Sequence, residues 1–136
     1  MAKLDSLCQQ WAPRLLSVLR IITGFLFVPH GAQKLFGLLG ARPGGPPPLF
    51  SQIWFAGVPE FFGGLLILVG LFTRPVAFIL SGMMAVAYFQ AHAPRGFRTI
   101  QNGGELAALY CFVFLYLSAA GAGPWGPDSI WRHGRT

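Results

Sequence analysis

Long apolar stretches, interrupted by short segments rich in proline, glycine and arginine, limit what this chain can fold into. A helix needs about 20 consecutive, mainly apolar residues to cross a bilayer. The interruptions leave four apolar stretches of about that size, at residues 14–39, 52–72, 75–93 and 103–120. The segment Ala41–Pro48 (ARPGGPPP) contains consecutive prolines, which a helix interior does not tolerate. The sequence therefore predicts four transmembrane helices.

The composition excludes a soluble domain. Of the 136 residues, 54% are hydrophobic and only 10% are charged, whereas soluble domains carry about 25% charged residues. The net charge of +6 comes from single basic residues beside apolar stretches, which is typical of membrane helices and does not indicate nucleic-acid binding. Cys8 and Cys111 lie too far apart in sequence to form a CxxC motif, so neither a zinc site nor any other metal site is expected.

Four helices with short connections predict an all-α up-down bundle that forms a single domain over residues 1–136, with both termini on one side of the membrane. Because Arg20 lies near the start of the first span, we expect its side chain to snorkel to the interface. The count of Lys and Arg favours cytoplasmic termini. Six basic residues fall on the terminal side, against four on the other side: Lys3, Arg14, Arg20, Arg74, Arg132 and Arg135 against Lys34, Arg42, Arg95 and Arg98.

Polar residues inside the predicted spans are candidates for function. A charge at the centre of a membrane helix costs about 2.5–3.5 kcal/mol, so such groups normally face the bundle interior or a wet cavity. His30, Gln33 and Lys34 share one helix face, because they are spaced by three and four residues. Glu60 lies between small glycine residues, which allow close helix contact, so we expect its side chain to point inward.

Alternating helix directions predict that the polar residues converge. Late positions in the first and third spans and early positions in the second and fourth spans occupy the same half of the membrane. The sequence thus predicts one polar chamber, away from the termini, formed by His30, Gln33, Lys34, Glu60, Tyr88, His92 and Glu105. The alternative is a purely structural ion pair between Lys34 and either Glu60 or Glu105.

Three segments carry a resemblance to a known family. They are PHGAQKLFG in the first span, PEFFGGLLILVGLFTRPVA across the second and third spans, and NGGELAALY at the start of the fourth. Together they resemble the DoxX family over Arg14 to Ile130. The chain departs from the family pattern in its proline-rich first loop and in the tail that precedes Asp128.

The resemblance implies a four-helix, multi-pass protein of the bacterial inner membrane. Family members are associated with redox complexes, and the related DoxD proteins look like subunits of a thiosulfate:quinone oxidoreductase. Mycobacterial DoxX is linked with superoxide dismutase and a sulfurtransferase. The positions that match the family motifs are His30, Gln33, Lys34, Glu60 and Glu105.

Three hypotheses about function follow. The first is a membrane subunit that associates with a larger oxidoreductase and binds a quinone in the polar chamber. The chain contains no flavin, nicotinamide or iron–sulfur motif, so no intrinsic cofactor is expected. The second is an accessory subunit that assists assembly without chemistry of its own, and the third is a haem protein with His30 and His92 as axial ligands. The residues alone leave open whether the chain is an enzyme.

Overall fold

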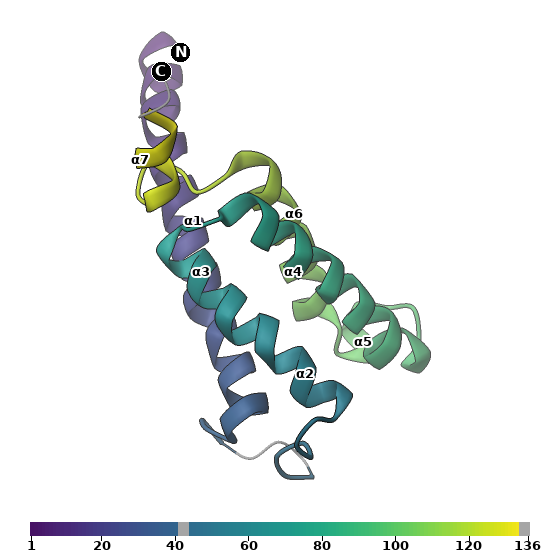
Figure 1. The fold of residues 1–136 in the computed structure, drawn as a ribbon. Helices are drawn as coiled ribbons and strands as arrows, with labels where there is room; N and C mark the ends of the chain where they lie inside the picture. Colours follow the sequence, from purple (N-terminus) through teal and green to yellow (C-terminus); the bar gives the residue numbers. More distant parts are fainter. Residues whose placement is uncertain (41–43, 134–136) are drawn as a thin grey trace.

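The computed structural model describes residues 1–40 and 44–133, and its regular elements over that part of the chain are all helical (Figure 1). Residues 41–43 of the predicted loop Ala41–Pro48 lie outside the described residues. In chain order the elements are α1 (Ala2–Phe36), α2 (Gln52–Val58), the π-helical turn η1 (Pro59–Gly63), α3 (Gly64–Val69), α4 (Thr73–Ala87), the π-helical turn η2 (Tyr88–His92), the 3₁₀ turn η3 (Ala93–Arg95), α5 (Thr99–Asn102), α6 (Glu105–Ala120) and α7 (Pro127–His133).

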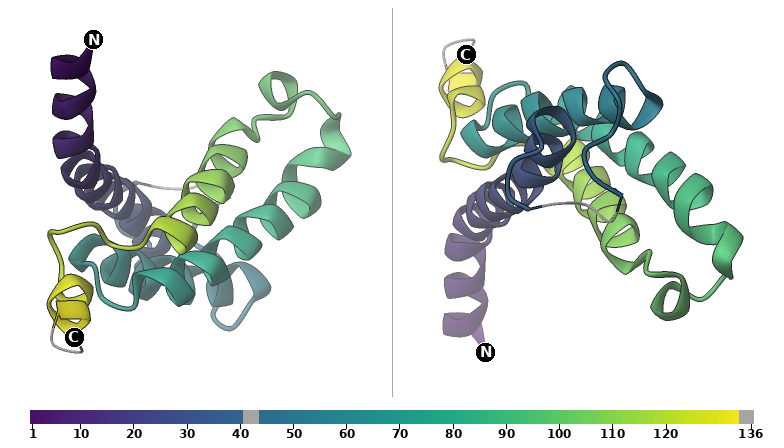
Figure 2. Two further views of the ribbon diagram at one scale, coloured as in Figure 1. Left: turned by 90° about the horizontal axis from the view of Figure 1, so that it is seen from above. Right: turned by 90° about the horizontal axis from the view of Figure 1, so that it is seen from below.

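The helices form two arms. In the first arm, α1 packs along the continuous rod made of α2, η1 and α3, and in the second arm α4 packs along α6. The arms are close together at the turn between α3 and α4 and diverge toward α2 and α5 (Figures 1 and 2). The start of α1 and helix α7 lie at the same end of the molecule (Figure 1). The ends of α2 and α5 therefore lie away from the chain termini.

Three helical rods are long and apolar enough to cross a membrane: Ala2–Phe36, Gln52–Val69 and Thr73–Arg95. Helix α6 is apolar but has only 16 residues, which corresponds to about 24 Å against a hydrocarbon core of about 30 Å. The predicted all-α class is confirmed with three candidate spans. The count of four spans and the membrane side of the termini stay predictions.

Glycines allow the two rods of the first arm to approach closely. A Cβ atom on Gly24 would lie 2.6 Å from the backbone nitrogen of Leu68, and one on Gly31 would lie 2.7 Å from Cα of Phe61. Real Cβ atoms do not approach backbone this closely, so only glycine permits this packing. The contact at Gly31 sets the position of the last turns of α1, which carry the polar residues His30 and Lys34.

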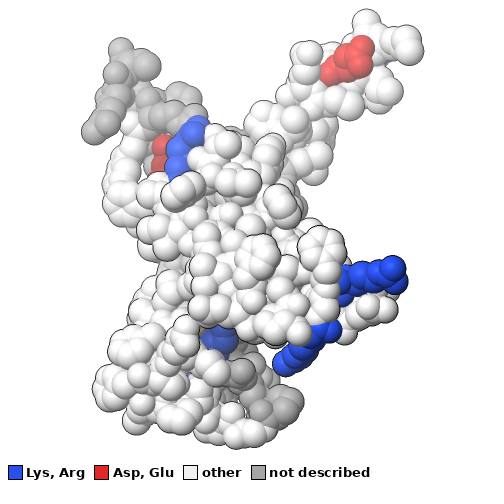
Figure 3. Space-filling model, turned by 90° about the vertical axis from the view of Figure 1, so that its right-hand side faces the viewer, with Lys and Arg blue, Asp and Glu red and all other residues white. Residues whose placement is uncertain are grey.

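The buried core is small and the outer surface is apolar. Large side chains that are largely exposed face outward from every long helix, among them Phe25, Phe62, Phe78 and Phe112. Most of the face in Figure 3 is uncharged, and basic side chains appear on it at a few separate places. Arg95 and Arg98 are exposed. This distribution fits a protein whose outer faces contact lipid. The core is formed by Phe27, Ile67, Ala77, Leu80, Met84, Tyr110, Phe114 and Leu117.

Arg20 lies in the interior. Its side chain is fully buried, and the prediction that it snorkels to the interface is wrong. Its guanidinium donates to the carbonyl oxygens of Ile67 and Leu68 at 2.6 and 2.5 Å, and to that of Ala122 at 2.9 Å. It also donates to the carbonyl oxygen of Trp125. Because the last carbonyls of a helix have no partner within it, Arg20 caps the end of α3 and ties the tail to both rods of the first arm.

Asp128 holds the start of α4. Its two carboxylate oxygens accept hydrogen bonds from the backbone nitrogens of Phe72 and Thr73, each at 2.8 Å. A carboxylate at a helix N-terminus satisfies free N–H groups and interacts favourably with the helix dipole. A cation and an anion thus stabilise the two helix ends that meet at the turn between the arms.

We expect Asp128→Ala to lower the free energy of unfolding by about 1–2 kcal/mol, the usual cost of losing a helix cap. The measurement is thermal unfolding in detergent, followed by circular dichroism. Asp5→Ala is the matched control, because Asp5 is exposed near the start of α1. If both variants unfold at the temperature of the wild type, Asp128 does not stabilise the turn.

Candidate functional site

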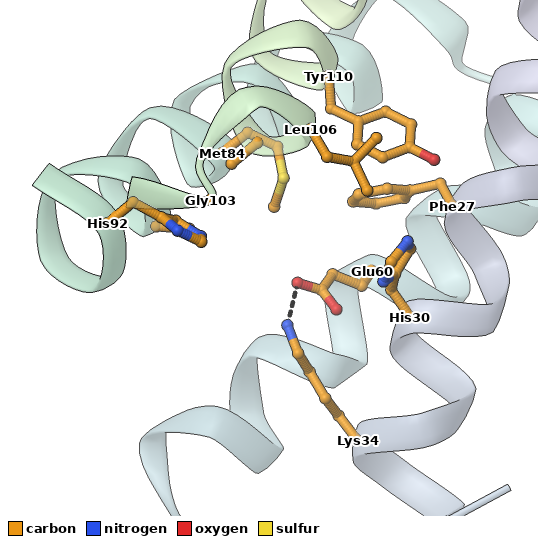
Figure 4. A pocket seen from close by; sticks show the side chains of 11 residues that line it. Phe27, His30, Lys34, Glu60, Met84, His92, Gly103, Leu106 and Tyr110 are labelled. Atoms are coloured by element: carbon orange, nitrogen blue, oxygen red, sulfur yellow. Dashed lines mark hydrogen bonds and ion pairs between the residues drawn. The ribbon is translucent and has the colours of Figure 1, made fainter. Parts of the chain in front are cut away.

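A partly open cavity of about 270 Å³ lies between the two arms (Figure 4). Residues of α1, η1, α4, η2 and α6 contribute to its wall, so neither arm forms it alone. Its lining residues are Phe27, His30, Lys34, Glu60, Met84, Ala87, His92, Gly103, Leu106, Ala107 and Tyr110.

An ion pair forms one polar side of the cavity. The ammonium of Lys34, in the last turn of α1, donates to Oε1 of Glu60 in η1. Glu60 is only 3% exposed, and its second oxygen, Oε2, has no hydrogen-bond partner among the described residues. Leaving a buried carboxylate oxygen unpaired is costly. Glu60 thus lines the cavity with one oxygen bound by Lys34 and the other buried without a partner among the described residues.

His92 lies on the opposite side of the cavity from Glu60, Lys34 and His30 (Figure 4). Its Nδ1 lies 3.1 Å from the carbonyl oxygen of Asn102. A carbonyl only accepts hydrogen bonds, so Nδ1 must carry the proton that is donated. In neutral His92 the other nitrogen, Nε2, is then an acceptor.

Asn102 organises the loop behind His92. Its side chain is buried, its Nδ2 donates to the Gly96 carbonyl at 2.8 Å, and its Oδ1 accepts from the Gly104 nitrogen at 2.7 Å. Nδ2 also lies 3.2 Å from the hydroxyl of Tyr88. This role of Asn102 is not predicted from the sequence, although an asparagine shortly before an apolar helix is a common capping signal.

Apolar side chains separate the two polar sides. Phe27 packs edge-on against Tyr110 with ring centroids 4.9 Å apart, and Met84 and Leu106 extend the wall toward His92 (Figure 4). These four residues are not predicted from the sequence, because an apolar residue in a cavity wall and one in an ordinary core give the same hydrophobic pattern.

The structure brings together four of the seven predicted chamber residues: His30, Lys34, Glu60 and His92. Gln33 instead donates to the Gly40 carbonyl at 3.1 Å, and the Tyr88 hydroxyl donates to the Phe97 carbonyl at 3.1 Å. Neither residue lines the cavity.

Glu105 also lies outside the cavity lining. It is exposed in the first turn of α6. An acidic side chain at this position interacts favourably with the dipole of the helix. This interaction with the helix dipole is a sufficient reason for a glutamate at position 105, and it needs no contact with the other predicted chamber residues.

Both sides of the cavity depend on π-helical turns. Glu60 lies in η1 and His92 lies in η2. Pro59 at the start of η1 supplies no backbone N–H, so the regular hydrogen-bond pattern is interrupted there. π-helical turns inside longer helices occur frequently at functional sites, where they redirect side chains.

A comparison with known protein families identifies the family of the chain. The sequence model of the DoxX family matches residues 15–93, more than half of the chain. The chain belongs to the DoxX family. All four polar residues of the cavity fall within the matched segment, whereas the α6 wall of this DoxX protein lies beyond it.

Two similar proteins come from Haemophilus influenzae, and both are described as uncharacterized. The first is 42% identical over 125 residues, which cover 89% of the DoxX chain and 93% of that relative. The second is 32% identical over 71 residues, covering 52% of the chain and 47% of that protein. No solved structure matches the chain.

Proposed function

We propose that this DoxX-family protein is a multi-pass inner-membrane subunit of a redox system, and that its cavity binds the headgroup of a quinone. The observation that carries the proposal is the arrangement of two polar sides across an apolar middle (Figure 4). A para-quinone has the same pattern, with one oxygen at each end of an apolar ring. Its hydrocarbon tail would reach the lipid through the open side of the cavity.

The size of the cavity supports a ligand with a single ring. A cavity of about 150 Å³ lined by apolar residues holds one benzene molecule. The volume of about 270 Å³ found here accommodates one ring with its substituents. Phe27 and Tyr110 provide aromatic contacts for such a ring.

Each polar group has a defined task in this proposal. Lys34, held in place by Glu60, donates to one ring oxygen, and His92 lies at the opposite end of the ring. Quinone reduction consumes protons, and buried ionisable groups next to the ring oxygens can supply or accept them. We place the electron donor on a partner chain, a larger oxidoreductase with which this subunit associates.

We expect Glu60→Gln to fold and to bind a quinone about tenfold more weakly, because the amide cannot hold the Lys34 ammonium in place as a carboxylate does. The measurement is calorimetric titration of the purified protein in detergent with a decyl-substituted benzoquinone. Glu105→Gln is the matched control and should bind like the wild type. Unchanged affinity in a folded Glu60→Gln variant would contradict the proposal.

One observation favours an accessory subunit without chemistry. The Lys34–Glu60 pair joins α1 to η1 within a single arm, as a purely structural ion pair does. In that case, removing the protein should lower the abundance of the assembled partner complex. Glu60→Gln would then destabilise the first arm without changing quinone affinity.

The haem alternative, with His30 and His92 as axial ligands, stays a prediction. The two histidines line the same cavity from opposite sides, and the Nδ1 atom of His92 is already bonded to Asn102. Only the Nε2 atom of His92 is therefore available to a metal. Titration of the purified protein with haemin, followed by its absorption spectrum, tests this alternative directly.

A further inference from the structure

We propose that the cavity selects the reduced form of its ligand, a quinol, over the oxidised quinone. This inference rests on the proposed function, because it specifies the ligand of the same cavity. A quinol has a hydrogen-bond donor at each end of its ring, whereas a quinone has only acceptors. The structure presents an acceptor at both polar sides of the cavity.

The acceptor at the first side is the carboxylate of Glu60. Oε1 is bound by Lys34, and Oε2 is buried without a partner among the described residues. A hydroxyl donates a hydrogen bond to the carboxylate and accepts one from the Lys34 ammonium, which has further protons. A quinone carbonyl accepts from Lys34 but supplies no donor to Glu60.

The acceptor at the second side is Nε2 of His92. The Asn102 carbonyl fixes the proton of the neutral imidazole on Nδ1. The Asn102 side chain is itself held by the Gly96 carbonyl and the Gly104 nitrogen, so the loop that imposes this tautomer is well anchored. A quinone carbonyl at this side would face the lone pair of Nε2, and a quinol hydroxyl would donate to it.

The test compares three ligands on the unchanged protein in detergent under argon. They are a decyl-substituted benzoquinone, the matching quinol, and the dimethyl ether of that quinol, which retains the ring and tail but has no donor. We expect the quinol to bind about tenfold more tightly than the other two, because each of them leaves acceptors unpaired. Calorimetric titration gives the three dissociation constants.

The outcomes separate this inference from the proposed function. Equal affinity for quinol and quinone, or tighter binding of the quinone, would overturn the selection of the reduced form while leaving the quinone site standing. Binding of none of the three ligands would overturn the site itself. A second measurement uses His92→Phe, which keeps a ring but removes the Nε2 acceptor. It should reduce the ratio of quinol to quinone affinity, and an unchanged ratio would show that His92 does not contribute to the selection of the quinol.

Discussion

Replacing Arg20 by leucine is expected to lower the free energy of unfolding by about 3–5 kcal/mol, among the largest effects of any single change in this protein. The guanidinium donates to four carbonyls, and an apolar side chain leaves those carbonyls buried and unpaired. The end of α3 and the tail that contains Ala122 and Trp125 would lose their common partner. The measurement is chemical unfolding in mixed micelles, followed by circular dichroism.

Two further variants test the explanation. Arg14→Leu is the control, because Arg14 is exposed and its guanidinium lies over the Trp11 ring. It should change stability by less than about 0.5 kcal/mol. The free energy of unfolding of Arg20→Lys should lie between those of Arg20→Leu and Arg14→Leu, since a lysine keeps the charge but lacks the planar set of donors. If Arg20→Leu were as stable as Arg14→Leu, Arg20 would not hold the tail to the first arm.

The second large effect is expected at Gly31. Gly31→Leu should cost about 3 kcal/mol or more and abolish ligand binding, because its side chain has to displace the backbone of Phe61. The displacement would move α1 away from η1 and separate Lys34 from Glu60. Unfolding in micelles and calorimetric titration with the decyl-substituted benzoquinone measure the two effects on the same preparation.

Gly82 provides the matched control for this position. Gly82 is an exposed glycine in α4, and a Cβ atom there would meet nothing within 4 Å. Gly82→Ala should therefore leave binding unchanged and raise stability by at most about 1 kcal/mol through helix propensity. A Gly31→Leu variant that binds the quinone like Gly82→Ala would show that the close approach of α1 and η1 is not needed for the site.

Much of the helical architecture could be predicted from interruptions in the apolar pattern. Proline and glycine segments ended the predicted spans because they remove backbone donors or favour turns. The alternation of helix direction then predicted that His30, Lys34, Glu60 and His92 share one end of the molecule. In the structure these four residues line a common cavity.

Other features depended on contacts that local patterns do not encode. The snorkelling of Arg20 was inferred from its distance to the helix start, but carbonyls distant in sequence bind it in the interior. The position of His92 depends on a π-helical turn and on Asn102, and neither has a periodic signal. Glu105 lies early in its helix, as the predicted chamber requires, but its side chain is exposed.

Native mass spectrometry of the protein extracted from its own membrane shows whether the cavity binds a quinone-type headgroup. We expect a quinone or quinol to be retained with the wild type and with Glu105→Gln, and to be lost from Glu60→Gln. Retention of stoichiometric protein partners without any quinone, with the same assembly in Glu60→Gln, would overturn the quinone site and favour an accessory subunit.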